Sequence, residues 1–166
     1  GLYSVDTLIV KDTHEYLINY LKENYYDEIK DLKLIAITGT NGKTTSCYLI
    51  SQMLNNLGIK CGYIGTIGFY INEKIKDLNN TTPDILDIYE MLLECKKNGC
   101  EYVALEASSH ALSKDRLKGL LFDYAVFTNL TEEHLDYHKT MENYALSKQK
   151  LFSMLKSYGK AIVNID

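Results

Sequence analysis

The chain has 166 residues, enough for one good α/β core, and its net charge at pH 7 is −4. It has no cluster of Lys and Arg, no apolar run of membrane-spanning length and no opening signal peptide. We therefore expect no nucleic acid partner, no membrane partner and a cytoplasmic location. The four cysteines form no C-x-x-C pair, so we expect reduced thiols within the core.

The first part of the chain contains a short strand pattern and a helix start. Residues 8–10 are typical of a strand, and Asp12, with a Glu three residues later, begins a capping-box pattern. Residues 23–31 are polar, which favours a linker. We therefore expect residues 1–31 to be the tail of an N-terminal domain plus a linker, and residues 32–166 to form a central domain.

A glycine-rich loop follows the first buried strand pattern, at residues 32–37. The loop reads T-G-T-N-G-K-T-T over residues 38–45, and apolar residues at helical spacing come after it. A strand, a glycine loop and a helix N-terminus together gather backbone N–H groups around a polyphosphate. Lys43 would reach the β- and γ-phosphates, and the Thr44 hydroxyl would bind Mg²⁺. The alternative is an ordinary glycine turn, because Ile37 stands where the common pattern has its first glycine.

A second polar segment precedes the next helix pattern. Residues 60–64 predict a strand and residues 65–71 a hairpin arm, with Asn72 near the turn. Thr82 fits a helix N-cap, and the proline after it fits the first helical turn. The hydroxyls and amide of residues 80–82 either cap this helix or bind an anionic ligand, and their chemistry alone leaves both options open.

Glu106 ends another buried strand pattern, at residues 101–105. In parallel α/β sheets this edge is where ligands bind. A carboxylate beside a phosphate loop suits Mg²⁺, which takes one or two protein carboxylates together with phosphate oxygens. The alternative is a plain, solvent-exposed Glu. Because the phosphate loop is present, we favour the metal role.

The residues after Glu106 include a serine and histidine pair that resembles a nucleophile and its base. Ser108 or Ser109 could be the nucleophile and His110 the base. Neighbouring side chains in a segment that we expect to be extended would point apart, however, and no G-x-S-x-G elbow surrounds them. We therefore reject a hydrolase triad. After a strand pattern at residues 122–127, His134 and His138 stand four residues apart, a weak zinc-like spacing. A metal site formed by Glu106 and one of these imidazoles is a simpler interpretation than a zinc site formed by both histidines.

Lys148 lies on the apolar stripe of the last helix pattern, which Thr140 caps. It stands four residues after Tyr144 on the same face. Such a lysine usually extends its ammonium group to solvent, and the alternative is a lysine needed inside a site. Lys150 and Lys156 are expected to face solvent, and residues 161–163 predict a final strand.

Five motifs in this order resemble the Mur ligases, most closely the MurE type, the UDP-N-acetylmuramoyl-L-alanyl-D-glutamate ligases. They are T-G-T-N-G-K-T-T at 38–45, N-T-T-P-D at 80–84, E-A-S-S-H-A-L at 106–112, N-L-T-E-E-H-L-D-Y-H at 129–138 and M-E-N-Y-A-L-S-K at 141–148. The phosphate loop alone would indicate only the wider superfamily. Two alternatives are another ligase of that superfamily, such as a folylpolyglutamate synthetase, and a nucleotide-binding module that does not ligate.

This resemblance implies a fold, a reaction and a set of partners. The fold is an α/β, P-loop three-layer sandwich with a mostly parallel sheet, the incomplete central domain of a Mur ligase. The reaction adds a diamino acid, lysine or diaminopimelate, to UDP-N-acetylmuramoyl-L-Ala-D-Glu through an acyl phosphate, with ATP and Mg²⁺ as cofactors. We expect a monomer that, without the other domains of such ligases, binds nucleotide weakly and does not turn over.

The resemblance also implies a role for individual residues. The ATP-binding residues are Gly39, Thr40, Asn41, Gly42, Lys43, Thr44 and Thr45. The substrate-binding residues are Asn80, Thr81, Thr82, Ser108 and Arg116. The catalytic residues are Lys43, Glu106 and Lys148, and the metal ligands are Thr44, Glu106, His134 and Lys148, the last as a carbamate. Two positions depart from the family pattern: Glu133 replaces an Asp, and Lys114 replaces a substrate-contacting Gln found in some relatives.

Overall fold

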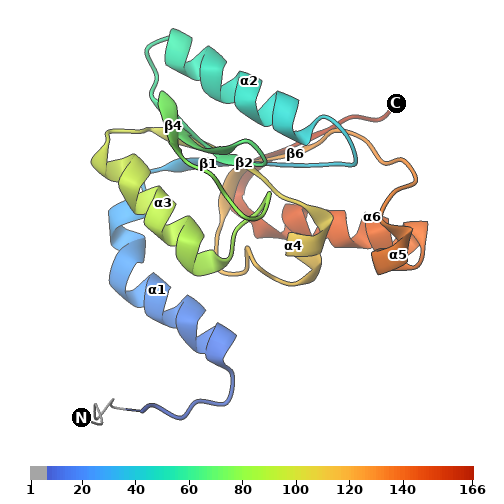
Figure 1. Ribbon diagram of the computed structural model, residues 1–166, viewed down its shortest axis with the longest axis horizontal. Coiled ribbons are helices and arrows are strands. Elements are labelled where there is room, and N and C mark those ends of the chain that lie inside the picture. Colours follow the sequence, from blue (N-terminus) through green and yellow to red (C-terminus); the bar gives the residue numbers. More distant parts are fainter. Residues whose placement is uncertain (1–6) are drawn as a thin grey trace.

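A seven-stranded sheet forms the centre of the protein in the computed structural model, which describes residues 7–166 (Figure 1). The strand order is β4-β3-β2-β5-β1-β6-β7, in which β2, β5, β1, β6 and β7 run parallel and the β3 and β4 pairings are antiparallel. The expected α/β fold with a mostly parallel sheet is confirmed. The strands are β1 (Lys33–Thr38), β2 (Cys61–Gly65), β3 (Gly68–Ile71), β4 (Glu73–Lys76), β5 (Tyr102–Glu106), β6 (Phe122–Phe127) and β7 (Leu155–Val163).

Helices cover both faces of the sheet and make three layers. Figure 1 shows α2 on one face, and α3, α4 and α6 on the other, with α1 outside α3. The helices are α1 (Thr13–Ile29), α2 (Lys43–Asn56), α3 (Ile85–Lys97), α4 (Ser109–Ser113), α5 (Leu135–His138) and α6 (Met141–Gln149), followed by the 3₁₀ helix η1 (Lys150–Met154).

The central strand β1 is buried on both faces, which explains its continuous apolar sequence. Ile35 and Ile37 pack in the core under α2, while Leu34 and Ala36 pack in the larger core under α3. The four cysteines are free and buried, as expected. The sheet therefore separates two apolar layers, and each requires a helix on its side.

The carboxyl end of β1 lies between the ends of β5 and β6. Ile37 is paired with Glu106 on one side, and Thr38 with Phe127 on the other. The strand order reverses direction at this point, because β1 is followed in sequence by a strand on the β5 side and later by β6 on the opposite side. The phosphate loop, Glu106 and the segment after β6 therefore meet at one edge of the sheet.

Helix α1 differs from the sequence-based expectation at both ends. Residues 8–10 form no strand; Leu8 and Ile9 are 65% and 90% exposed, so they lack the packing that a strand needs. Residues 23–31, expected to be a linker, are helical up to Ile29, because Ile18, Leu21 and Ile29 are buried in the core and anchor the helix on α3. The assignment of residues 1–6 to a preceding domain falls outside the described residues.

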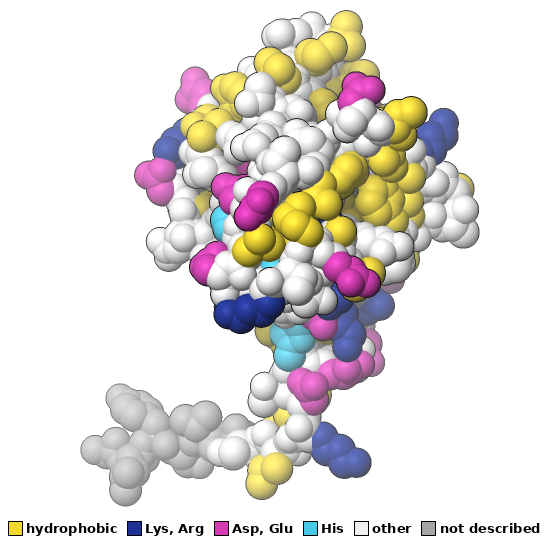
Figure 2. All heavy atoms as spheres, turned by 90° about the vertical axis from the view of Figure 1, so that its right-hand side faces the viewer, with side chains coloured by type: hydrophobic (Ala, Val, Ile, Leu, Met, Phe, Trp, Pro, Cys, Tyr) yellow, Lys and Arg dark blue, Asp and Glu magenta, His cyan; other side chains and the backbone are white. Residues whose placement is uncertain are grey.

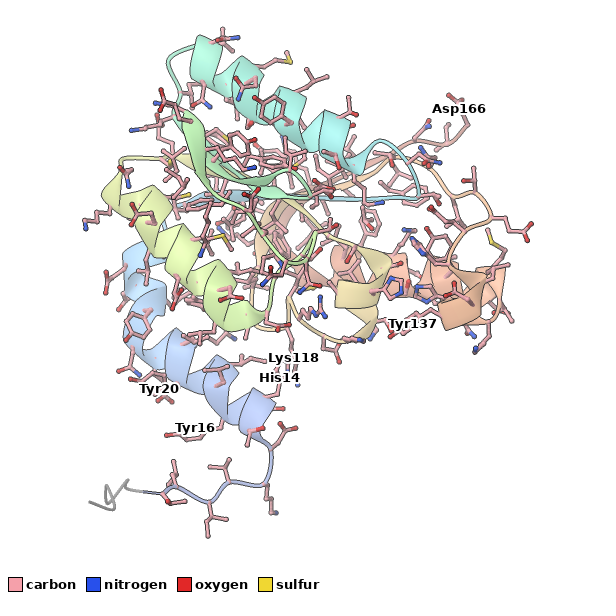
Figure 3. The ribbon with its side chains drawn as sticks, viewed as in Figure 1. His14, Tyr16, Tyr20, Lys118, Tyr137 and Asp166 are labelled. Atoms are coloured by element: carbon pink, nitrogen blue, oxygen red, sulfur yellow. The ribbon has the colours of Figure 1, made fainter. Side chains whose placement is uncertain are left out.

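The N-cap half of the capping-box prediction for α1 is confirmed, whereas the Glu15 carboxylate accepts from Lys118 at 2.9 Å. Asp12 accepts hydrogen bonds from the backbone N–H groups of His14 at 2.9 Å and Glu15 at 3.0 Å. Figure 3 shows Tyr16 and Tyr20 pointing away from the sheet, and Lys118, from the loop after α4, beside His14. The first turn of α1 is therefore fixed both by its own cap and by this loop.

Three further local predictions are wrong. Thr82 does not cap α3; Asp84 is the N-cap residue, because the Thr82 hydroxyl donates instead to the Glu106 carbonyl oxygen at 2.8 Å. Ser109 starts the short helix α4 rather than an extended segment, because the Ser108 side chain caps it. Lys156 is not solvent-facing, because its ammonium group lies 2.9 Å from Asp123 Oδ2.

The surface away from the sheet edge carries a mixture of apolar and charged side chains. Figure 2 shows the right-hand side of Figure 1 head-on, with apolar side chains towards its middle and charged side chains of both signs spread around them. None of the helices formed by residues 7–166 has the length and apolar character needed to span a bilayer.

Candidate functional site

A cavity of about 630 Å³ opens at the carboxyl edge of the sheet. It brings together every residue that the family resemblance assigned to the site except Gly39, which belongs to the same loop but does not line the cavity. Thr66, Ser109, His110, Lys114 and Tyr144 also line the cavity. The lining candidates are Thr40, Asn41, Gly42, Lys43, Thr44, Thr45, Asn80, Thr81, Thr82, Glu106, Ser108, Arg116, His134 and Lys148.

The phosphate loop needs its two glycines for different reasons. Gly39 has a φ of +148°, and a Cβ on it would overlap the hydroxyl of Thr128. Gly42 has a φ of +82° and is the N-cap residue of α2, in the left-handed region that L side chains rarely adopt. The first N–H groups of α2, which have no partner within the helix, therefore face the loop, as an anion-binding site requires.

The segment after β6 braces the loop, a contact that sequence reasoning missed. Asn129 Oδ1 accepts from the Asn41 backbone N–H at 2.9 Å, and the Asn129 carbonyl oxygen accepts from the Thr40 N–H at 2.9 Å. The Thr128 hydroxyl donates to the Asn41 carbonyl oxygen at 2.6 Å. The only sequence signal was the position of these polar residues directly after a buried strand.

Lys43 folds back over its own loop. Its ammonium group donates to the carbonyl oxygens of Gly39 at 2.9 Å and Thr40 at 2.7 Å. Burial lowers the pKa of Lys43, against the opposing effect of Glu106 and Glu133. The positive charge is thus held at the centre of the loop, where a bound anion would offset the cost of burial.

Glu106 is almost completely buried, with 1% of its surface exposed, and its carboxylate is fully hydrogen-bonded. Oε1 accepts from the Tyr63 hydroxyl at 2.5 Å and from the Thr66 N–H at 2.9 Å. Oε2 accepts from the hydroxyls of Thr44 at 2.9 Å and Thr66 at 3.2 Å. Burial, together with the hydrogen bond to Glu106, raises the pKa of the Tyr63 hydroxyl, which therefore stays protonated and donates. The idea of a plain, exposed Glu106 is wrong.

The donor set suits a hard divalent cation that arrives with a phosphate ligand. Within residues 7–166 no group of three or more His, Cys, Asp or Glu side chains could hold a metal by itself. Thr44 and Glu106 nevertheless place a hydroxyl and a carboxylate oxygen 2.9 Å apart at the mouth of the phosphate loop. Mg²⁺ commonly takes one or two protein carboxylates and fills its other positions with phosphate oxygens and water. The residues present therefore fit Mg²⁺ bound together with a nucleotide.

The opposite wall of the cavity comes from the segment before α3 and from α4. The Thr82 hydroxyl accepts from the Ser108 N–H at 3.0 Å and lies 3.1 Å from the Ser108 hydroxyl. Arg116 donates to the Thr82 carbonyl oxygen at 3.1 Å and pairs with Asp84 at 3.0 Å. Asn80 and Thr81, which are more exposed, line the cavity between this wall and the phosphate loop. This arrangement presents hydroxyl, amide and guanidinium groups that could bind an anionic ligand.

Lys148 lies inside the site and does not extend to solvent. It is 2% exposed, and its ammonium group donates to the Gly39 carbonyl oxygen at 2.7 Å while lying 4.2 Å from the centre of the Tyr144 ring. Burial, with the nearby charge of Lys43, lowers the pKa of Lys148 from 10.5 to about 7. A substantial fraction of this lysine is therefore the neutral amine at neutral pH.

The histidines separate into two environments. His134 is exposed at the cavity, with Nε2 3.7 Å from a Glu133 carboxylate oxygen and its ring 5.0 Å from that of His110. His138 is buried, and its Nε2 lies 3.0 Å from the Ser109 hydroxyl. Because His138 is occupied in this way, the two histidines do not form a zinc pair. Burial lowers the pKa values of both His110 and His138.

Sequence comparison shows the family of this chain and its similarity to two curated ligases. The family described as "Mur ligase middle domain" matches residues 37–166. The UDP-N-acetylmuramoyl-L-alanyl-D-glutamate--2,6-diaminopimelate ligase of Fusobacterium nucleatum subsp. nucleatum is 42% identical over 165 residues, which are 99% of this chain and 33% of that protein. The ligase of the same name from Clostridium perfringens is 44% identical over 158 residues, 95% of this chain and 32% of that protein. The chain spans about a third of the length of these curated relatives.

Solved structures share the fold. A UDP-N-acetylmuramoyl-L-alanyl-D-glutamate--2,6-diaminopimelate ligase superposes with a TM-score of 0.76 at 39% identity, over 92% of this chain and 30% of the other. The MurF ligase from Thermotoga maritima, solved in complex with ADP, superposes with a TM-score of 0.66 at 18% identity, over 99% of this chain and 35% of the other. At this lower identity the similarity shows the fold alone.

Proposed function

Because this chain belongs to the Mur ligase family, whose middle domain it matches over residues 37–166, we propose that it is the ATP-binding part of a carboxylate–amine ligase of peptidoglycan synthesis. The observation that carries the proposal is the single cavity in which a phosphate loop, a buried carboxylate and a wall of hydroxyl and guanidinium groups face one another. The phosphate groups of a nucleotide and the reacting end of an acceptor substrate could meet there. A module that only binds nucleotide would have no use for the second wall.

The phosphate loop would bind the triphosphate of ATP. The backbone N–H groups of the first turn of α2 and the ammonium group of Lys43 would surround the phosphates, since α2 begins at Lys43 directly after the loop. The N–H groups of Thr40 and Asn41 already donate to Asn129 and would hold the loop in shape. Thr44 and Glu106 would hold Mg²⁺, which neutralises phosphate charge during transfer. His134, at the cavity mouth, would be a further ligand.

The opposite wall would hold the acceptor, UDP-N-acetylmuramoyl-L-Ala-D-Glu. Its D-glutamyl γ-carboxylate would take the γ-phosphoryl group of ATP, giving an acyl phosphate and ADP. The amine of the diamino acid would then attack the acyl carbon, forming the amide and releasing phosphate and a proton. The role of Asn80, Thr81, Thr82, Ser108 and Arg116 would be to keep the carboxylate in line with the phosphate. The names of the relatives favour 2,6-diaminopimelate as the amine.

Lys148 would serve this site as an anion. A neutral lysine amine adds to CO₂, forming a carbamate and releasing a proton, and the lowered pKa of Lys148 supplies the neutral amine near pH 7. The negative group so formed would help to hold a second Mg²⁺ and would remove the repulsion between Lys148 and Lys43. Burial at the Gly39 carbonyl places the amine beside the phosphate loop, where such a ligand is useful.

The rest of the reaction requires more than this chain. Since the chain spans about a third of its relatives, we propose that residues 1–31 finish an N-terminal domain and residues 32–166 form most of a central domain in a longer, monomeric, cytoplasmic ligase. The amino acid would be selected outside this chain. By itself the chain would bind nucleotide weakly and would not turn over.

The proposal is tested by ADP release in the full-length ligase of which this chain would be part. ATP, the uridine-linked muramoyl dipeptide and either lysine or diaminopimelate are supplied together and one by one. Release should require the dipeptide and one diamino acid, and Lys43→Met should weaken ATP binding about 10- to 100-fold, the range for hydrogen bonds to a charged group. ATP turnover that ignores the dipeptide would reject the ligase and favour a nucleotide-binding module.

A further inference from the structure

The buried carboxylate of Glu106 is held by a segment that lies outside the phosphate loop. The Tyr63 hydroxyl donates to Oε1. Thr66 donates to both carboxylate oxygens, to Oε1 through its N–H and to Oε2 through its hydroxyl. These two residues lie on β2 and in the turn between β2 and β3. Two of the four hydrogen bonds to this carboxylate therefore come from the turn after β2, and a third comes from β2 itself.

Gly65 makes this close approach possible. A Cβ on Gly65 would overlap both Glu106 Oε1 and the Tyr63 hydroxyl. Its backbone does not adopt a positive φ, so the requirement for glycine here is one of space and not of backbone conformation. The turn is shaped to admit the carboxylate.

Thr66 also contacts the opposite wall of the cavity. Its hydroxyl oxygen lies 3.0 Å from that of Thr81, in the segment before α3. A hydroxyl has one hydrogen, and the Thr66 hydroxyl donates it to Glu106 Oε2. Thr81 must therefore donate to Thr66, which gives a directed chain from Thr81 through Thr66 to the carboxylate. Hydrogen bonds in such a chain polarise one another.

We propose that Thr66 is a positioning residue that couples the nucleotide side of the cavity to its acceptor side, by linking the Glu106 carboxylate to the Thr81 hydroxyl. The bond from Thr66 holds Oε2 where it can bind a cation together with the Thr44 hydroxyl. By donating to Thr66, the Thr81 hydroxyl keeps the Thr66 hydrogen turned towards Oε2, so an acceptor substrate that bonds to Thr81 changes how the carboxylate is held. Tyr63 holds the same carboxylate, but within residues 7–166 its hydroxyl has no hydrogen bond to the acceptor wall, so it positions without coupling. This inference rests on the proposed function.

The test is a double-mutant cycle on nucleotide binding by the 166-residue chain. Affinity for the Mg²⁺ complex of a non-hydrolysable ATP analogue is measured from amide NMR shifts in Thr66→Val, Thr81→Val and the double variant. Loss of one hydrogen bond predicts an affinity about two- to tenfold weaker for Thr66→Val. If the link exists, Thr81→Val weakens binding in the wild-type background and has no effect when Thr66 is already Val.

Two controls separate coupling from general damage. Thr66→Ser keeps the hydroxyl and should keep wild-type affinity. Tyr63→Phe removes a bond to the same carboxylate without breaking the link, so Thr81→Val should keep its full effect in that background. In EDTA, without Mg²⁺, the differences between Thr66 variants should shrink.

The outcomes distinguish the two proposals. Weak binding by the wild-type chain is expected; if neither this chain nor the full-length ligase binds the nucleotide, the proposed function fails and this inference fails with it. If the wild-type chain binds but the effects of Thr66→Val and Thr81→Val add, or Thr66→Val binds as wild type, the coupling is wrong while the nucleotide site stands. Equal non-additivity in the Tyr63→Phe background would also overturn it, because the effect would then be a general one.

Discussion

Replacing Lys148 with Met should flatten the pH dependence of stability above neutral pH. The lysine is buried with its ammonium group on the Gly39 carbonyl oxygen, and its pKa is lowered to about 7. A lysine with a lowered pKa binds its proton less tightly in the folded protein than in the unfolded chain. Stability therefore falls as the pH drops from the unfolded pKa of 10.5, and the full cost is present below about pH 7.

The magnitude follows from the two pKa values of Lys148. A difference between 10.5 and about 7 corresponds to a cost on the order of 5 kcal/mol when the lysine is fully charged. Between about pH 7 and about pH 9 the wild-type chain should recover about 2 kcal/mol of this cost. Met is similar in length to Lys but carries no charge. The stability of the variant therefore should not rise in this way with pH, and the variant lacks the hydrogen bond to the Gly39 carbonyl oxygen.

The assay is urea unfolding of the wild-type chain and of Lys148→Met, followed by circular dichroism at several pH values between about pH 7 and pH 9. Buffers are free of CO₂ and of divalent metal, so that the amine stays unmodified. Subtracting the unfolding free energy of the wild-type chain from that of Lys148→Met cancels the titration of the other groups. This difference should decrease steadily as the pH rises. Parallel curves would refute the lowered pKa of Lys148.

Three further predictions concern other parts of the fold. Gly65→Ala should push Glu106 from its place and cost about 1–3 kcal/mol in urea unfolding, the range for overpacking; wild-type stability would show that the turn has spare room. Asp123→Ala should lower the free energy of unfolding by about 3–5 kcal/mol, because it leaves a charged Lys156 without its partner and the two side chains are largely buried, Lys156 at 12% and Asp123 at 10% exposed. A loss below about 1 kcal/mol would mean that the Lys156 ammonium group moves into solvent. Burial lowers the pKa of His138, so stability should fall as the pH drops below 6.5, and His138→Gln should flatten that fall in thermal unfolding scans; an unchanged slope would assign it to other groups.

The sequence identified the parts of the site that single motifs encode. The phosphate loop, Glu106 and Lys148 could be placed because each combines an unusual residue with a strong periodic pattern: a glycine loop between strand and helix, a carboxylate at a buried strand end, and a lysine on an apolar stripe. The buried strand patterns after residue 31 were placed correctly for the same reason, whereas the strand expected at residues 8–10 does not form. The roles of these residues in binding and catalysis remain predictions.

What the sequence missed depends on contacts between distant segments. Tyr63 and Thr66 read as ordinary strand and turn residues, and only the pairing of β2 with β5 brings them to Glu106. Thr82 has the right residue type and spacing for a helix cap, but the Glu106 carbonyl oxygen attracts its hydroxyl. Lys156 pairs with an Asp 33 residues earlier, on the neighbouring strand. No local pattern reports such partners.

The central position of β1 has a consequence for how the chain folds. Its neighbours are β5 and β6, so that Ile35 pairs with Ala104 and with Tyr124, whereas β2, β3 and β4 pair through short turns. Closing such long loops is slow, because the entropy is lost before the contacts form. During synthesis β1 emerges early and must wait for both partners, so the loop at its end acquires its shape only after β6 has docked. Nucleotide binding would therefore appear among the last events of folding, and its recovery after dilution from denaturant would report on completion of the whole sheet.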